Sequence, residues 1–329
     1  MNRKTIRIVV IILAAALLVA AAPFALSRLI YRRSLEATMF EQQIRSGGRD
    51  AEPDAGRLWM ARKAAVSAGP LYLPEDIQAS WSQESFAWDG GTMDWYCAGS
   101  GTELVIVYFH GGSFIDRPSQ AHWLFADRLA CDTGAQVIVP LYPRLPDNTA
   151  DDAYAALDAF YRGQIEPLGN AKLVFMGDSA GGGMALALAE KLAAEGLKGP
   201  EQLVLISPWL DLSMDNDDMD AYADKDPKLD RGALRYAGSC WAGERDVHDP
   251  LISPLYGDFS AVGRIELYAG TRELLYPDIV RFADRLDAAG HDYTLYTGSG
   301  MNHVWPLFQC YHLKEAETAL NDIEEKILR

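Results

Sequence analysis

The sequence has little positive charge and few cysteines, and both shortages limit what the protein can do. Its 30 lysines and arginines are outnumbered by 46 aspartates and glutamates, which gives a net charge of −16. A surface of this sign repels polyanions, so we exclude nucleic-acid binding. The four cysteines form neither a CxxC motif nor a cysteine–histidine cluster. We therefore expect no zinc site and no other bound metal. The cysteines are Cys97, Cys131, Cys240 and Cys310.

Charge is absent altogether from one segment near the N-terminus, residues 8–27. Twenty helical residues rise about 30 Å, the thickness of the hydrocarbon core of a bilayer. We therefore expect residues 1–33 to hold one transmembrane helix that anchors the protein in the cell membrane. A secretory signal cleaved near Ala20–Ala22, followed by secretion, is the alternative. The small excess of basic residues before the segment favours a cytoplasmic N-terminus and an extracytoplasmic remainder.

The rest of the chain lacks internal repeats and low-complexity linkers. Residues 34–90 are polar and are predicted to form an N-terminal helical region. Beyond them, short apolar runs alternate with segments of helical periodicity, which predicts an α/β domain over residues 91–329. Because the runs carry little charge, we expect a mostly parallel central sheet with helices on both faces. The predicted strands are residues 103–109, 135–142, 172–177, 201–207, 264–270 and 292–298. The predicted helices are residues 120–132, 150–163, 182–196 and 276–290.

An acidic stretch at residues 211–230 interrupts this alternation between two predicted strands. Its aspartates could suggest calcium, but the spacing lacks the glycine and the terminal glutamate of an EF-hand loop. We therefore interpret residues 211–245 as a solvated insertion.

The sequence GDSAGG places Ser179 between Gly177 and Gly181 in a G-x-S-x-G pattern. The pattern follows a predicted strand and precedes a predicted helix. A strand that turns sharply into a helix leaves no room for side chains on either side of the apex. The serine hydroxyl is then exposed above the sheet, near the positive end of the helix. We predict that Ser179 is a nucleophile.

A serine nucleophile needs a general base, and in folds of this type the base comes last in the chain. His248, His291 and His303 are candidates after Ser179. His291 opens the last predicted strand and belongs at the opposite edge of the sheet. His303 follows that strand, where a base can meet the serine, and is the predicted base.

The base in turn needs an acid that orients it, and the segment after the preceding strand offers two. Glu273 comes three residues after Gly270, at the carboxyl end of the strand. Asp278 lies at the start of the next helix, where an aspartate has an ordinary capping role. We predict Glu273 as the acid, with Asp278 as the alternative.

A site is also needed for the negative charge that develops on the attacked carbonyl oxygen. The sequence His110-Gly111-Gly112 follows the strand at residues 103–109, and glycines there let backbone N–H groups approach one point. The Ala180 amide would complete this oxyanion hole.

Taken together, these motifs resemble the hormone-sensitive-lipase-like branch of the α/β-hydrolase esterases. The matching stretches are HGG (110–112), GDSAGG (177–182), ISPWLDLS (206–213), DPLISPLYGD (249–258), GTRELLYPD (270–278) and GMNHVW (300–305). The resemblance covers roughly residues 80–329. Three features depart from it: the acid position is more often aspartate, PLYPRLPD matches the family's usual turn only loosely, and the predicted transmembrane segment lies outside the family domain.

The resemblance implies hydrolysis of small carboxylic esters of short to medium acyl chain through an acyl-enzyme, without a cofactor and beneath an N-terminal helical cap. It gives each residue a role. Ser179 is the nucleophile, His303 the base and acid, Glu273 the orienting carboxylate, and Gly111, Gly112 and Ala180 the oxyanion hole. His110, Gly177, Asp178 and Gly181 support the motifs. A deacetylase or lactonase acting on envelope or xenobiotic esters is the alternative, followed by a binding protein that kept the fold without the chemistry.

Overall fold

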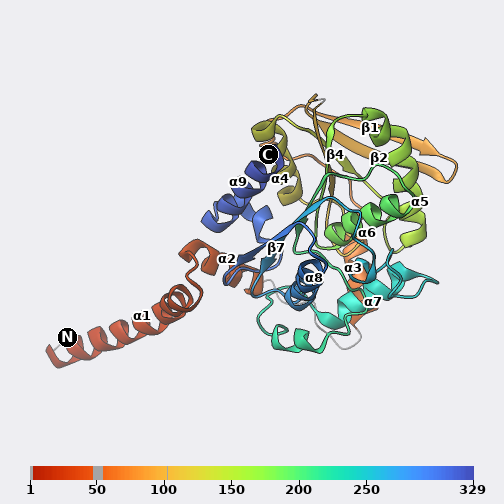
Figure 1. The fold of residues 1–329 in the computed structure, drawn as a ribbon. Helices are drawn as coiled ribbons and strands as arrows, with labels where there is room; N and C mark the ends of the chain where they lie inside the picture. Colours follow the sequence, from red (N-terminus) through yellow and green to blue (C-terminus); the bar gives the residue numbers. More distant parts are fainter. Residues whose placement is uncertain (1–2, 47–54, 102) are drawn as a thin grey trace.

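The computed structural model describes residues 3–46, 55–101 and 103–329, and an eight-stranded sheet forms its centre (Figure 1). The strand order is β1-β2-β4-β3-β5-β6-β7-β8. All neighbours from β4 to β8 run parallel, while β1 and β2 are antiparallel additions at one edge. The strands are β1 (Trp81–Trp88), β2 (Gly91–Ala98), β3 (Leu104–Phe109), β4 (Gln136–Pro140), β5 (Lys172–Asp178), β6 (Gln202–Ile206), β7 (Arg264–Gly270) and β8 (Tyr293–Gly298). The six predicted strands and the mostly parallel sheet are confirmed.

The prediction of a helical region that continues to residue 90 is wrong at its end. Residues 81–98 instead form the β1–β2 hairpin, in which Trp88 pairs with Gly91 beside the turn. Most side chains of β1 are exposed. A half-exposed antiparallel strand carries polar residues between apolar ones, so it lacks the continuous apolar run that identified the parallel strands.

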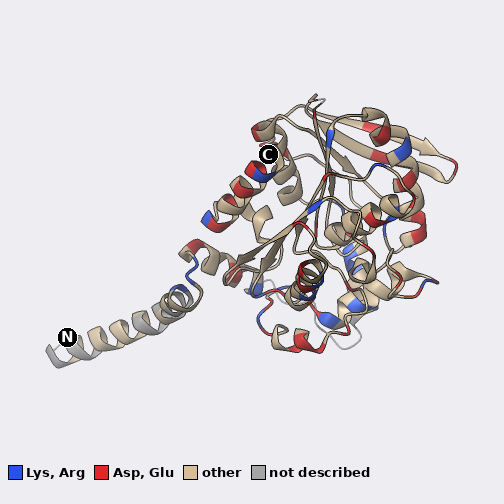
Figure 2. Ribbon diagram, viewed as in Figure 1, with Lys and Arg blue, Asp and Glu red and all other residues tan. Residues whose placement is uncertain are grey.

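Helices cover both faces of the sheet, as predicted, because alternate strand residues face opposite ways. Val105 and Val107 of β3 pack in one core with α5, α6 and α8, while Ile106 and Tyr108 pack in a second core with α4 and α9. The bounds are α4 (Gln120–Thr133), α5 (Ala150–Phe160), α6 (Ala180–Ala194), α8 (Tyr276–Ala289) and α9 (Lys314–Leu328). Figure 2 shows acidic residues, in red, along these outer helices, in keeping with the net charge.

Two separate segments build the cap above the carboxyl ends of the strands. The first comprises α2 (Leu35–Ser46) and α3 (Ala55–Ser67), and the second is the excursion between β6 and β7, which contains α7 (Arg231–Ala242). The helices α3 and α7 pack against each other. The excursion runs from residue 207 to 263 and contains the predicted insertion at 211–245. Its aspartates are partly neutralised by its own arginines, for instance Asp220 by Arg231 at 2.6 Å.

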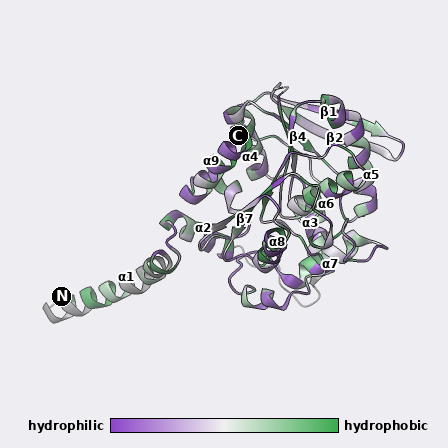
Figure 3. Cartoon of the chain, viewed as in Figure 1, coloured by the Kyte–Doolittle hydropathy of each residue, from purple (hydrophilic) through white to green (hydrophobic). Residues whose placement is uncertain are grey.

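The N-terminal helix α1 (Arg3–Tyr31) projects away from the body of the molecule (Figure 1). Its described side chains include exposed apolar ones, such as Ile11 and Leu17, and Figure 3 shows hydrophobic colour along it. Within the described ranges, no helix meets the joint requirement of length and apolarity for crossing a bilayer. The predicted transmembrane helix is therefore not supported.

Candidate active site

A sharp turn joins β5 to α6 and carries Ser179 at its apex. The φ of Ser179 is 53° and its ψ is −121°, a strained conformation of a kind that costs about 1–3 kcal/mol. Backbone hydrogen bonds hold the turn: the Ser179 N–H donates to the Ile206 carbonyl over 2.9 Å, and the Trp209 N–H donates to the Ser179 carbonyl over 2.8 Å. The strain is therefore maintained by the neighbouring strand and the segment that follows it.

The glycines beside Ser179 are required by close backbone approach. A Cβ on Gly181 would lie 2.0 Å from the Phe109 carbonyl oxygen, and a Cβ on Gly177 would lie 2.4 Å from the Gly181 carbonyl oxygen. Both obstacles are backbone atoms, so neither can move without shifting β3 or α6. The steric reason predicted for these glycines is present in the structure.

Three polar side chains from three loops meet at this turn. His303 Nε2 lies 2.9 Å from Ser179 Oγ, and His303 Nδ1 lies 2.7 Å from Glu273 Oε2. The second carboxylate oxygen, Oε1, accepts the Gly270 N–H over 2.7 Å. With Nδ1–H donating to the carboxylate, Nε2 is free to accept the serine proton. The structure thus joins the three residues predicted as nucleophile, base and acid.

The environment of Glu273 is closed to solvent, since the side chain is 0% exposed. Burial raises the pKa of Glu273, while His303, the Ser207 hydroxyl and the Gly270 amide favour the charged form and oppose the rise. Ser207 also accepts the Val304 N–H over 3.0 Å, so it bridges the acid and the loop that carries the base. Sequence reasoning gave Ser207 no role, although it lies at the end of a predicted strand and within the matching stretch at residues 206–213.

The alternative acid, Asp278, has a different environment. It lies in the first turn of α8 and accepts a hydrogen bond from Asn216 Nδ2 over 2.7 Å. Burial raises its pKa to about 6. The other candidate histidines also lie elsewhere, because His291 contacts the Gly263 carbonyl and His248 contacts Asp246. Among the candidate acids and bases predicted from the sequence, only Glu273 and His303 form a hydrogen bond with each other beside Ser179.

The loop after β3 departs from the predicted oxyanion hole in one residue. The Gly111 N–H donates to Asp178 Oδ1 over 2.9 Å, so this amide is already committed. In the described part of the chain, the amides of Gly112, Ser113 and Ala180 have no backbone acceptor. Gly112 and Ser113 line the same cavity as Ser179, at φ values of 119° and 59°. The prediction of Gly111 as a donor is therefore wrong, and Ser113 takes its place as a candidate.

Asp178 explains why Gly111 is held. Its Oδ1 also accepts the Tyr108 hydroxyl over 2.7 Å, and its Oδ2 lies 3.3 Å from His122 Nε2. Burial would raise the pKa of Asp178, but His122, Tyr108 and the Gly111 amide outweigh it, and the pKa is lowered. An ionised Asp178 thus ties the loop after β3 to the residue before the nucleophile, as predicted for a supporting role. His122 was not identified from the sequence.

His110 braces the same loop from the other side. Its ring stacks on Tyr142 at 4.6 Å and 16°, and its Nδ1 donates to the Gly111 carbonyl over 2.8 Å. Burial lowers the pKa of His110 to about 3, so the ring is neutral. The Tyr142 hydroxyl donates to the His110 carbonyl over 2.6 Å. These contacts fix the backbone of the loop that carries the candidate oxyanion donors.

A cavity of about 550 Å³ opens onto the serine and the histidine. Its walls come from both cap segments and from the loop after β8. Its apolar lining includes Val66, Leu71, Leu229, Leu307 and Phe308. Ser179 and His303 are only 7% and 8% exposed. An ester carbonyl that entered the cavity would therefore meet the hydroxyl away from bulk water.

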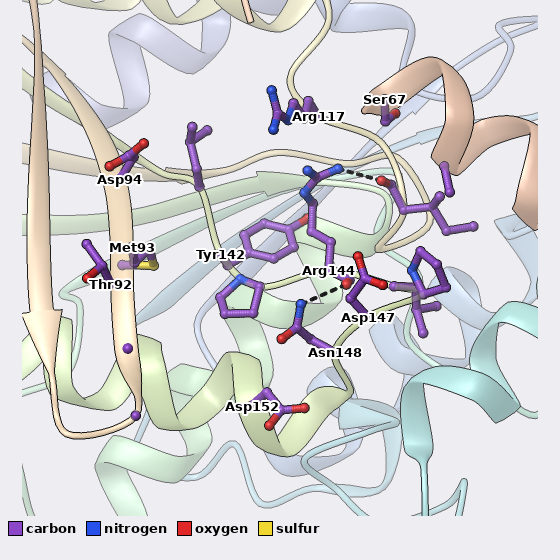
Figure 4. A pocket seen from close by; sticks show the side chains of 18 of the residues that line it. Ser67, Thr92, Met93, Asp94, Arg117, Tyr142, Arg144, Asp147, Asn148 and Asp152 are labelled. Atoms are coloured by element: carbon purple, nitrogen blue, oxygen red, sulfur yellow. Dashed lines mark hydrogen bonds between the residues drawn. The ribbon is translucent and has the colours of Figure 1, made fainter. Parts of the chain in front are cut away.

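A second, larger cavity of about 870 Å³ adjoins the first and contains none of the three triad residues. The two cavities share Ser67 and Arg117 in their walls. Figure 4 shows Arg117 and Arg144 in the second cavity, and Arg144 Nη1 donates to the Ile115 carbonyl over 2.5 Å. Arg144 therefore buttresses the loop that follows the candidate oxyanion donors. Among the described residues, no three His, Cys, Asp or Glu side chains are grouped to hold a metal ion.

Comparison with known proteins agrees with this geometry. Residues 106–307 match a family described as alpha/beta hydrolase fold. The chain is 32% identical over 207 residues to a triacylglycerol lipase of Mycobacterium tuberculosis, a match that covers 63% of this chain and 43% of the lipase. The chain thus spans less than half of that lipase's length. It is 31% identical over 234 residues to an esterase of Acinetobacter venetianus, covering 69% of this chain and 75% of the esterase.

Solved structures give the same assignment. A hormone-sensitive lipase from a metagenome library superposes with a TM-score of 0.73 at 26% identity, covering 88% of this chain and 97% of the lipase. The chain therefore belongs to the α/β-hydrolase family, in the branch of esterases that resemble hormone-sensitive lipase, and it is a carboxylic ester hydrolase.

Proposed function

We propose that this serine carboxylesterase cleaves its substrate in two acyl-transfer steps at Ser179. The observation that carries the proposal is the unbroken chain of hydrogen bonds from Glu273 through His303 to Ser179 Oγ, at 2.7 and 2.9 Å, beside a cavity. Ser179 attacks the ester carbonyl while His303 takes its proton. The alcohol leaves with that proton, and water repeats the sequence to release the acid.

The oxyanion of each tetrahedral intermediate is held by the amides of Gly112, Ser113 and Ala180. Gly111 is left out of this set because its N–H already donates a hydrogen bond to Asp178. Gly112 and Ser113 both have positive φ values, and the amide of Ala180 stands at the positive end of α6. Each such donor is worth roughly 10²- to 10³-fold in rate.

The substrate is a small ester with a short to medium acyl chain. The support is the size of the catalytic cavity, about 550 Å³, and its mixture of aliphatic and aromatic side chains with a few polar groups. Ser67 and Arg117 line both this cavity and the second one, so polar groups stand where the two meet. A polar boundary of this kind disfavours extended alkyl chains.

The test compares the full chain with its Ser179→Ala variant on p-nitrophenyl esters from acetate to palmitate. We expect hydrolysis of the acetate and butyrate esters by the full chain and none above background by the variant. A fluorophosphonate probe should label the full chain alone. Labelling that survives in the variant would refute Ser179 as the nucleophile, and fastest turnover of the palmitate ester would refute the acyl preference.

We also propose that the segment 1–33 attaches the catalytic domain to the cell membrane from outside the cytoplasm. The exposed apolar side chains of α1 and the basic residues that precede them in sequence support attachment. Cell fractionation with protease treatment of intact cells tests it. Recovery of a shortened chain in the medium would favour cleavage and secretion, and a protease-protected domain would contradict the orientation.

A further inference from the structure

A buried carboxylate outside the triad joins the N-terminal segment to both catalytic loops. Glu41, on α2, is 2% exposed and accepts hydrogen bonds from three guanidinium groups. These belong to Arg33 at 2.5 Å, Arg45 at 2.8 Å and Arg272 at 2.9 Å. Burial alone would raise the pKa of Glu41, but the arginines outweigh it and the pKa is lowered. The carboxylate is therefore ionised where the three cations converge.

Arg272 connects Glu41 to the catalytic acid, because it directly precedes Glu273 in the chain. Its Nη2 donates to Glu41, its Nη1 donates to the Tyr31 hydroxyl over 2.9 Å, and its guanidinium lies 5.0 Å from the centre of the Tyr31 ring. Its backbone N–H donates to the Met301 carbonyl over 3.1 Å. Arg272 is thus held from three sides between the cap and the loop that leads to the base.

Arg33 connects Glu41 to the catalytic base. Its Nη1 donates both to Glu41 and to the Gly300 carbonyl, the latter over 2.6 Å. Gly300 precedes His303 by three residues, and its N–H donates to Thr271 Oγ1 over 2.7 Å. One carboxylate therefore reaches the acid loop through one arginine and the base loop through another.

We propose that Glu41 is a positioning residue for the acid–base pair: through Arg272 and Arg33 it fixes the separation of Glu273 and His303. The inference rests on the proposed triad. Loss of the Glu41 charge would leave three guanidinium groups together at a buried point without their shared counter-ion. Their repulsion would push the two loops apart and lengthen the 2.7 Å contact between carboxylate and imidazole. Misplacement on the order of 1 Å can lower a rate by about 100-fold.

The experiment substitutes Glu41→Gln in the full chain and measures kcat and KM for p-nitrophenyl butyrate, the rate of fluorophosphonate labelling, and Tm. We expect kcat to fall roughly 10- to 100-fold, labelling to slow in the same proportion, and KM to change much less. The labelling rate reports activation of Ser179 in a single step, so it separates a misplaced acid–base pair from slower product release.

A matched control is Glu315→Gln. Glu315, on α9, accepts the Ser34 N–H over 2.5 Å and the Ser34 hydroxyl over 2.7 Å, so it docks the same N-terminal segment without touching either catalytic loop. We expect it to lower Tm and leave kcat unchanged. Equal loss of kcat in both variants would show that Glu41 acts only by docking the segment, and wild-type kcat in Glu41→Gln would overturn the proposal directly.

Should Glu41→Gln fail to fold, Tyr31→Phe removes only the hydroxyl that contacts Arg272 and keeps the ring beneath its guanidinium. We expect a several-fold lower kcat and labelling rate, and unchanged values in a folded Tyr31→Phe variant would refute the proposal. Ser179→Ala tests the triad separately, because it removes the nucleophile and leaves Glu41 and its three arginines in place.

Discussion

Glu190 is a buried acidic group with no role in the site, and its ionisation should limit stability at high pH. It lies on α6, the helix that follows the nucleophile, and is 6% exposed. Within the described residues, neither carboxylate oxygen has a hydrogen-bond partner. Burial raises its pKa from 4.5 to about 8, against a smaller opposing effect of Arg285. The folded protein therefore holds a proton that the unfolded chain releases.

The sign of the effect follows from this difference. A group whose pKa is higher in the folded state stabilises the protein fully below pH 4.5, and the stabilisation is lost as pH rises through about 8. Between pH 5 and pH 9, the linkage relation with these two values gives a loss of about 4 kcal/mol. Glu190→Gln cannot ionise and should escape that loss.

The assay is denaturant unfolding of the wild type and of Glu190→Gln at pH 5, 7 and 9, followed by tryptophan fluorescence. The free energy of unfolding of the variant minus that of the wild type should rise by about 4 kcal/mol between pH 5 and pH 9. A constant difference between the two proteins does not affect this change. Glu195→Gln is the control, because Glu195 lies at the end of the same helix and pairs with Arg162 at the surface. A wild-type-to-variant difference that stays constant within about 0.5 kcal/mol across the series would refute the reasoning.

Two further substitutions test the site and its scaffold. Glu273→Gln should lower kcat by roughly 10³- to 10⁴-fold, because the amide no longer holds the charge that stabilises the imidazolium, whereas Asp278→Asn should leave kcat nearly unchanged. Steady-state kinetics on p-nitrophenyl butyrate decides between them, and the reverse ranking would return the acid role to Asp278. Gly181→Ala should destabilise by about 1–3 kcal/mol and lower kcat, since its Cβ would lie 2.0 Å from the Phe109 carbonyl oxygen. Gly199→Ala, where a Cβ meets nothing within 4 Å, is its control in the same unfolding and kinetic assays; an equal loss in both would show that the close contact at Gly181 does not matter.

Much of the catalytic constellation was predictable because its signals are local. The glycines beside Ser179 follow from a steric demand within five residues, and the structure meets that demand. Glu273 and His303 were placed by a topological rule, that parallel strands bring the loops after them to one edge. The rule identifies the edge of the sheet but not which side chains touch there, so it leaves both Glu273 and Asp278 as candidate acids. The hydrogen bond between Glu273 and His303 distinguishes them.

The predictions failed where the role of a residue depends on a contact with a distant part of the chain. The β1–β2 hairpin was missed because its outer strand is exposed and polar. Gly111 was chosen as an oxyanion donor because the sequence shows a glycine pair and does not show which N–H is already bonded to Asp178.

The sequence by itself determined the parallel sheet, the strained serine turn and the loops that carry the acid and the base, because each depends on residues adjacent in the chain or on strand order. Only the tertiary structure decided which amides remain free for the oxyanion and which carboxylate orients His303. It alone also showed that Glu41 on α2 reaches Arg272, which stands 231 positions further along the chain. Such contacts are set by packing between distant segments, and no local pattern of side chains encodes them.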